Sequence, residues 1–98
     1  MDRTMTTTTT VMASKDQVSC DLAGEAAILN LKNSVYYGLD AVGARIWTLV
    51  QAPITVGAVR DAILQEYDVE RGQCEQDVLD LLQRLAAEGL VAITTDAA

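Results

Sequence analysis

The first half of the chain alternates between apolar and polar residues, which is the pattern of short β-strands with one buried face. Residues 17–22, 25–31 and 34–39 follow this alternation. Two pairs of turn-forming residues, Ala23-Gly24 and Lys32-Asn33, separate them, and asparagine tolerates the positive φ that a two-residue turn requires. Three strands joined by tight turns predict an antiparallel meander.

After Asp40 the apolar residues recur every three to four positions, which is the period of an amphipathic helix. Asp40 and Thr55 are good N-cap residues, and Gly89 stands where a left-handed glycine commonly ends a helix. These signals predict three helices, over residues 41 to about 51, 56 to about 67 and about 73 to 88. Residues 90–94 either form a short last strand or cover the core.

The predicted order is therefore three strands followed by three helices. Each element is amphipathic and needs the others to bury its apolar side. The fold class is α+β and winged helix-turn-helix-like, with a three-stranded antiparallel sheet followed by three helices. Residues 1–15 are rich in threonine and carry no period, so we expect a flexible tail, with a frayed strand near residues 10–12 as the alternative. The domain is expected over residues 16–94, followed by a disordered C-terminus over 95–98.

Composition and charge narrow the classes of function. The 98 residues are enough for one domain, and with no phenylalanine its core must be largely aliphatic. Fourteen acidic residues against seven basic ones give a formal charge of −7. This charge argues against nucleic acid and against an anionic membrane surface as partners. No apolar run is long enough to span a membrane, and the N-terminus lacks the apolar core of a signal peptide, so we expect a cytoplasmic protein.

The residue type most used in catalysis is missing. The chain has no histidine, which removes the commonest general base and metal ligand. Cys20 and Cys74 are isolated from each other, so we expect small core residues rather than a disulfide. Gly38 and Gly43 do not fit a phosphate-binding loop. We therefore predict a protein that is not an enzyme, with no catalytic residues, no cofactor and no metal.

Two features of the pattern point to a partner. The apolar arc of the third helix is wider than one packed seam requires, because Leu79 and Leu82 broaden it. Either both flanks of this helix pack inside the domain, or part of the arc lines a groove for a partner. The strand over 34–39 carries no proline, lysine or other charge, so it lacks the usual protection of an edge strand. Either the fold covers this edge, or the edge accepts another strand.

Three motifs carry a resemblance to a known family. They are YYGLD at residues 36–40, GARIW at 43–47 and DVLDLLQRLAAEGLV at 77–91. In this order and spacing, over about residues 16–93, they resemble the PqqD-like family of RiPP recognition elements. The chain looks most like the stand-alone members of lasso-peptide biosynthesis. It departs from the family at the second turn, where a glycine is usual and this chain has Lys32-Asn33-Ser34.

The resemblance implies a non-catalytic protein that binds the leader segment of a precursor peptide. The leader would add as a strand to the third strand, lie in a cleft against the third helix, and be presented to a leader peptidase and also to an ATP-dependent cyclase. An alternative is a PqqD-like peptide chaperone for a radical-SAM or other RiPP-modifying enzyme. A winged-helix transcription factor is disfavoured because Glu75, Asp77 and Asp80 make the third helix acidic. A subunit that only stabilises a larger enzyme remains open, and the edge strand also permits a homodimer.

The predicted peptide-binding residues lie on two elements. They are Ser34, Val35, Tyr36, Tyr37, Gly38 and Leu39 on the third strand, and Cys74, Glu75, Asp77, Val78, Leu79 and Leu82 on the third helix. Leu79 and Leu82 are the principal candidates for the helical wall. Tyr37 is expected on the core side of its strand, whereas Tyr36 on the opposite face either packs a leader side chain or shields the sheet. Trp47 is expected as packing between the first helix and the sheet.

Overall fold

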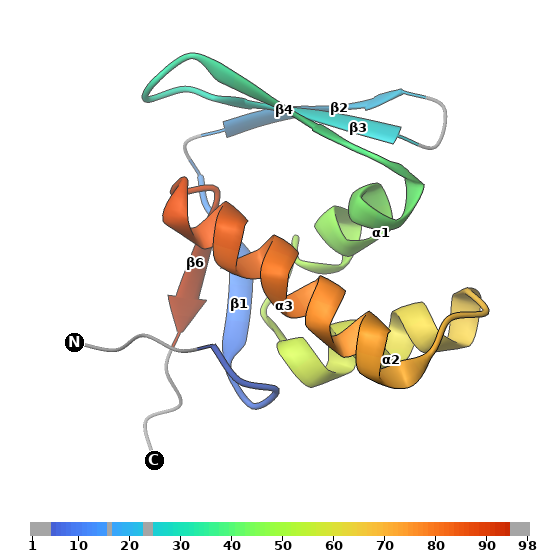
Figure 1. Ribbon diagram of the computed structural model, residues 1–98. Helices are drawn as coiled ribbons and strands as arrows, with labels where there is room; N and C mark the ends of the chain where they lie inside the picture. The colour runs from blue at the N-terminus through green and yellow to red at the C-terminus, as the bar shows by residue number, and fades with distance from the viewer. Residues whose placement is uncertain (1–4, 16, 23–24, 95–98) are drawn as a thin grey trace.

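The computed structural model describes residues 5–15, 17–22 and 25–94. It contains two three-stranded antiparallel sheets and three helices in these residues (Figure 1). One sheet has the order β2-β3-β4, with β2 at Gln17–Leu22, β3 at Glu25–Asn30 and β4 at Val35–Leu39. The other has the order β5-β1-β6, with β1 at Thr10–Ala13, β5 at Ile54–Thr55 and β6 at Val91–Thr94. The predicted α+β class is confirmed, with three strands beyond the predicted meander.

The helices begin and end at signals that the sequence displays. Helix α1 is Ala41–Leu49, α2 is Val56–Glu66 and α3 is Arg71–Ala87. The side chain of Asp40 accepts a hydrogen bond from the N–H of Gly43 at 2.8 Å, and Thr55 caps α2 in the same way. Glu70 caps α3, which therefore starts earlier than predicted. Gly89 has φ of 77°, as expected of a glycine that ends a helix.

The N-terminal segment differs from the expected flexible tail. Strand β1 is the central strand of its sheet, because it pairs with β5 on one side and with β6 on the other. The side chains of Met5 and Val11 are buried, with 3% and 0% of their surface exposed. Residues 5–13 thus belong to the folded domain, whose boundary lies earlier than residue 16, and the alternative of a strand near residues 10–12 is confirmed. The other part of the domain prediction, a disordered C-terminus at 95–98, lies outside the described residues.

The turn between β3 and β4 also differs from the prediction. It spans four residues, 31–34, rather than two. The residue with positive φ is Ser34, at 61°, whereas Asn33 was expected to take it. Asn33 instead accepts a hydrogen bond on its side chain from the N–H of Val35 at 3.0 Å, which stabilises the turn through the side chain. The other predicted turn, Ala23-Gly24, lies outside the described residues.

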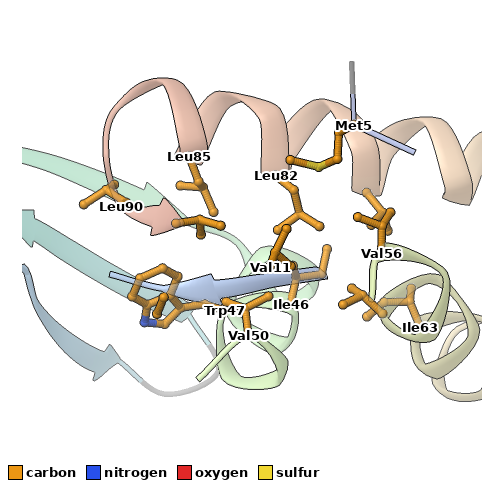
Figure 2. Packing of buried hydrophobic residues seen from close by; sticks show 14 of the residues in the cluster. Met5, Val11, Ile46, Trp47, Val50, Val56, Ile63, Leu82, Leu85 and Leu90 are labelled. Carbon is orange, nitrogen blue, oxygen red and sulfur yellow. The ribbon is translucent and has the colours of Figure 1, made fainter. Parts of the chain in front are cut away.

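A single aliphatic core fills the space between the helices and the two sheets (Figure 2). Its fully buried members come from every layer, and they include Val11, Ile28, Val59, Ile63, Leu82 and Leu90. Trp47 is also buried, so its expected role as packing beneath the sheet is confirmed. Cys74 is buried as expected, whereas Cys20 is exposed. No helix in the described residues has the length and apolar character of a membrane span.

The β2-β3-β4 sheet covers α1 with one face and leaves the other face outside (Figure 1). Ala26, Ile28 and Asn30 of β3 are buried on the inner face. Val18, Leu29 and Tyr36 lie opposite one another on the three strands, on the outer face. Tyr36 is 71% exposed there. The sheet therefore covers one side of the core. Its two edge strands are β2 and β4.

Candidate functional site

A groove lies between β4 and α3. Its larger part has a volume of about 580 Å³ and is lined by Gly38, Leu39, Asp40, Val42, Gly43, Ile46, Ile63, Val69, Gln73, Cys74, Asp77, Val78, Leu81 and Arg84. A smaller hollow of about 180 Å³ continues it and is lined by Tyr36, Tyr37, Gly38, Leu39, Leu81, Arg84, Leu85 and Glu88. Four residues border both parts, so we treat them as one feature and call it the β4–α3 groove.

One wall of the groove is an edge of backbone. Strand β4 pairs with β3 on one side, and within the described residues no strand pairs with its other side. Such an edge presents N–H and C=O groups that a further strand can use. The groove runs along α3 from Gln73 to Glu88. At about 1.5 Å per residue this helical wall is about 22 Å long, which matches an extended segment of about six or seven residues.

The floor of the groove is apolar and its helical rim is charged. The floor consists mainly of aliphatic side chains from β4 and all three helices, which are Leu39, Val42, Ile46, Ile63, Val78 and Leu81. On α3, Asp77, Arg84 and Glu88 stand along the rim. Gln73 donates a hydrogen bond to Asp77 at 2.8 Å. The guanidinium of Arg84 makes no ion pair or hydrogen bond with the part of the chain that the structure describes. The guanidinium of Arg84 is therefore available to form an ion pair with a bound ligand.

A hydrogen bond across the smaller hollow joins the two walls. The phenol of Tyr37 on β4 donates to the carboxylate of Glu88, just beyond the end of α3. This bond, more than any other influence, raises the pKa of Tyr37 above its ordinary value. The backbone carbonyl of Glu88 also accepts from the side-chain amide of Asn30 at 2.8 Å. Two contacts thus fix the end of α3 against the sheet, and they set the separation of the walls there.

Seven of the predicted peptide-binding residues border the groove. Gly38, Leu39, Cys74, Asp77 and Val78 line its larger part, and Tyr36 and Tyr37 line the smaller hollow. Tyr37 is also partly buried and packs against the core, as expected of the inner face of its strand. The strand and the helix named by the prediction therefore lie on the two sides of one groove.

Five predicted residues lie elsewhere. Ser34 and Val35 are exposed at the start of the strand and border neither part of the groove. Glu75 forms an ion pair with Arg60 of α2 at 2.7 Å. Leu82 has no exposed surface, so its side chain cannot contact a ligand. Leu79 packs partly buried against the core and does not line the groove.

The residue that replaces Leu79 on the groove side is Leu81. Two residues along a helix are about 200° apart, so these leucines lie on opposite flanks of α3. The stripe that faces the groove consists of Gln73, Asp77, Leu81, Arg84 and Glu88. Its spacing of three to four residues was visible in the sequence, but of these five residues only Asp77 was among the predicted peptide-binding residues. Leu81 and Arg84 are the functional candidates that the sequence analysis missed.

Comparison with known proteins finds relatives that resemble this chain over both β4 and α3, the two walls of the groove. The family model for coenzyme PQQ synthesis protein D (PqqD) matches residues 25–91, which cover β3, β4 and all three helices. A solved structure described as "TbiB1 in Complex with the TbiA(beta) Leader Peptide" is 38% identical, with a TM-score of 0.78 over 87% of this chain and 99% of that one. A search of curated proteins found no significant relative.

A second solved structure, "Lasso peptide synthetase B1 complexed with the leader peptide", shares the fold. It is 20% identical, with a TM-score of 0.73 over 84% of this chain and 96% of that one. The family model spans well over half of the 98 residues. The chain therefore belongs to the PqqD family.

Proposed function

We propose that this chain is a non-catalytic RiPP recognition element that binds the leader segment of a lasso precursor peptide in the β4–α3 groove. The observation that carries the proposal is the edge of β4 that no strand pairs with in the described residues, beside a groove that has an apolar floor and is about as long as an extended segment of six or seven residues. The relative that is 38% identical was solved with a leader peptide, which supports the same ligand class here. The chain would then recognise an extended peptide rather than transform one.

The leader would bind by strand addition to β4. Its backbone would pair with the free edge, and alternate side chains would point toward the floor between β4 and α3. Four to six backbone hydrogen bonds, at about 0.5–1.5 kcal/mol each, would fix its direction. Two or three apolar side chains on the floor would each contribute about 1.5–3 kcal/mol. Ordering the peptide costs about 2–5 kcal/mol, so we expect affinities between micromolar and nanomolar.

Charge on the rim adds selectivity. Arg84 borders both parts of the groove and has no ion-pair partner in the described residues. We therefore expect the leader to place an acidic side chain near Arg84. Asp77 lies about two turns earlier on the same stripe and would favour a basic or neutral residue at the other end. The two rim charges would help to set the direction of the peptide, although each exposed pair contributes little to affinity.

Chemistry on the bound precursor would belong to partner enzymes. The chain has no histidine, and its described residues contain no cluster of side chains able to hold a metal. We therefore assign leader cleavage to a leader peptidase of the same pathway, and ring closure to its cyclase, with this chain as the carrier. In the absence of leader, the edge of β4 can also pair with a second copy.

The family model favours a second candidate function. Because it describes a protein of coenzyme PQQ synthesis, the chain is alternatively a peptide chaperone for a radical-SAM or other RiPP-modifying enzyme. The binding physics is the same and only the enzyme partner differs. The genes beside this one discriminate between the two, since a peptidase and an asparagine-synthetase-like cyclase indicate the lasso pathway.

The test is a titration of the isolated protein into a fluorescein-labelled synthetic leader, taken from the neighbouring precursor gene. We expect saturable anisotropy with a Kd in the micromolar to nanomolar range. Hydrogen exchange of the complex should show new protection on β4, because its free N–H groups become paired. An absence of binding contradicts the proposal, and so does saturable binding that leaves the exchange of β4 unchanged.

A further inference from the structure

The outer face of the β2-β3-β4 sheet carries an apolar row. Figure 1 shows all three helices on the other side of this sheet. An antiparallel sheet with one face on the core commonly turns polar side chains outward. Here the residues that lie opposite one another on the three strands are Val18, Leu29 and Tyr36. Val18 is 55% exposed and Tyr36 is 71% exposed. Such a patch indicates a surface that another molecule covers.

A glycine lies beside Tyr36 on the same face of β4. Gly38 comes two residues after Tyr36 and pairs with Ala27 of β3. Its φ is not positive. A Cβ atom at this position would meet no other atom of the described residues within 4 Å, its chain neighbours aside. The domain therefore has no steric need for a glycine here, although glycine weakens a strand. Glycine in a strand also marks sites where a ligand approaches closely.

A peptide strand that pairs with β4 extends the sheet and its outer face. Successive side chains of a strand point to opposite faces. Every second leader side chain therefore lies on the outer face, while the others point to the floor of the β4–α3 groove. Side chains opposite each other on paired strands have Cβ atoms about 4.5–5.5 Å apart, and diagonal neighbours are within reach of an aromatic ring. The ring of Tyr36 can thus contact a leader side chain opposite itself or opposite Gly38.

We propose that the leader is recognised on both faces of its strand, and that one outward-facing leader residue carries a large apolar side chain that lies over Gly38 and packs against Tyr36. This inference rests on the proposed function. It makes Tyr36 and Gly38 determinants of specificity outside the β4–α3 groove. Backbone pairing accepts almost any sequence, whereas this contact selects against leaders with a small or charged residue at that position.

A second copy of this chain is a poorer occupant of the outer face. The three strands have five or six residues each, so the face measures about 18 Å by about 14 Å. Two such faces packed together would bury about 250 Å² on each copy, whereas a stable interface buries about 800 Å² per partner. A leader needs less area on this face, because its backbone is also held by the adjoining edge of β4.

Thermodynamic cycles between protein and peptide test the proposal. Each residue of the fluorescein-labelled synthetic leader is replaced by alanine in turn, and anisotropy titrations use wild type, Tyr36→Thr and Leu81→Ala. Threonine keeps the strand propensity and removes an exposed ring, so we expect circular dichroism to show a folded variant. At one large apolar leader residue, alanine should weaken binding to wild type by about threefold or more. The same replacement should not weaken binding to Tyr36→Thr further.

The alternation of side chains gives a stricter criterion. Leader residues that couple to Leu81 face the groove, so the residue that couples to Tyr36 should lie an odd number of positions from them. Coupling at an even separation overturns the proposal, because it places the partner of Tyr36 on the groove side. Coupling of Tyr36 to a charged or small leader residue, or to none, also overturns it.

Matched variants test the location on the sheet. Gly38→Val fills the space over the strand, so the affinity advantage of the large leader residue over alanine should fall. Ala92→Val adds the same group at an exposed position of β6 that borders neither part of the groove, and it should leave this advantage unchanged. An equal advantage in wild type and Gly38→Val overturns the placement over Gly38.

A second control separates the leader from other occupants of the outer face. Val18→Ala removes an apolar side chain of the same row on the far edge strand, where a peptide paired with β4 cannot reach it. Leader affinity should not change. A loss as large as that of Tyr36→Thr overturns the proposal. A leader that does not bind the wild type refutes the proposed function, whereas binding that protects β4 without coupling to Tyr36 refutes this inference alone.

Discussion

Tyr37 on β4 and Glu88 at the end of α3 are joined by a hydrogen bond from phenol to carboxylate. These residues are far apart in the sequence, yet they span the smaller hollow of the β4–α3 groove. Because the backbone of Glu88 is also held by Asn30, this end of the groove is fixed before any ligand arrives. A fixed wall reduces the ordering that a bound peptide must impose on the protein.

The first prediction concerns pH. The bond to Glu88 raises the pKa of Tyr37, so its stabilising effect is fully present below the ordinary tyrosine pKa and is lost as pH rises through the raised value. We expect the difference in ultraviolet absorbance between wild type and Tyr37→Phe to titrate above pH 10. The stability gap between these two proteins should close over the same range. In Glu88→Gln the Tyr37 transition should move down toward its ordinary value, and an unmoved transition contradicts the assignment.

The second prediction compares two leucines on α3. Leu81 lines the β4–α3 groove, whereas Leu79 lies on the opposite flank of the helix. Leu81→Asp should weaken leader binding by about tenfold or more, because one apolar contact of about 1.5–3 kcal/mol is lost. Leu79→Asp should change it far less, and circular dichroism should confirm that both variants fold. Equal losses in anisotropy titrations would show that this stripe is not the peptide-binding face.

The third prediction concerns Leu82, which the sequence analysis assigned to the cleft. Its side chain is fully buried in the core. Leu82→Ala should therefore lower the free energy of unfolding by about 2–5 kcal/mol in urea titrations, with little change in the affinity of the protein that remains folded. Leu82→Asp should unfold the domain, because it buries a charge without a partner. A folded Leu82→Asp variant is incompatible with this packing.

The fourth prediction tests the N-terminal segment. Removal of residues 1–13 deletes β1 together with the buried side chains of Met5 and Val11. These two side chains alone contribute about 3–6 kcal/mol at about 1.5–3 kcal/mol each. We expect a truncated protein that is unfolded or strongly destabilised, as measured by thermal denaturation. Removal of a flexible tail would instead leave the stability of the domain unchanged. An unchanged Tm therefore excludes a structural role for this strand.

Local chemistry made most of the fold predictable. The N-cap residues Asp40 and Thr55 accept hydrogen bonds from backbone N–H groups three residues later, and Gly89 ends its helix by adopting a positive φ. Each of these signals depends on only a few neighbouring residues. The alternation of the three predicted strands is likewise local, and β2, β3 and β4 lie within one residue of the prediction at each end. Such features need no knowledge of distant parts of the chain.

The errors came from relationships between distant residues. Strand β1 is stabilised by pairing with β5 and β6, more than forty residues later, and a short threonine-rich run does not show those partners. The apolar arc of α3 was visible, but its rotation against β4 decides whether Leu79 or Leu81 faces the groove. The turn before β4 was expected to have two residues, with positive φ at Asn33, whereas it has four residues and the positive φ is at Ser34.

The antiparallel pairing of β1 with β6 has a practical consequence. Thr10, the first residue of β1, lies opposite Thr94, the last residue of β6, so these two strand ends lie at the same side of that sheet. Figure 1 shows this side away from the sheet that contains β4. A biosensor surface, an affinity tag or a fused carrier can therefore be attached before Met5 or after Thr94 without covering the edge of β4. Either attachment gives an immobilised protein whose groove still faces the solution.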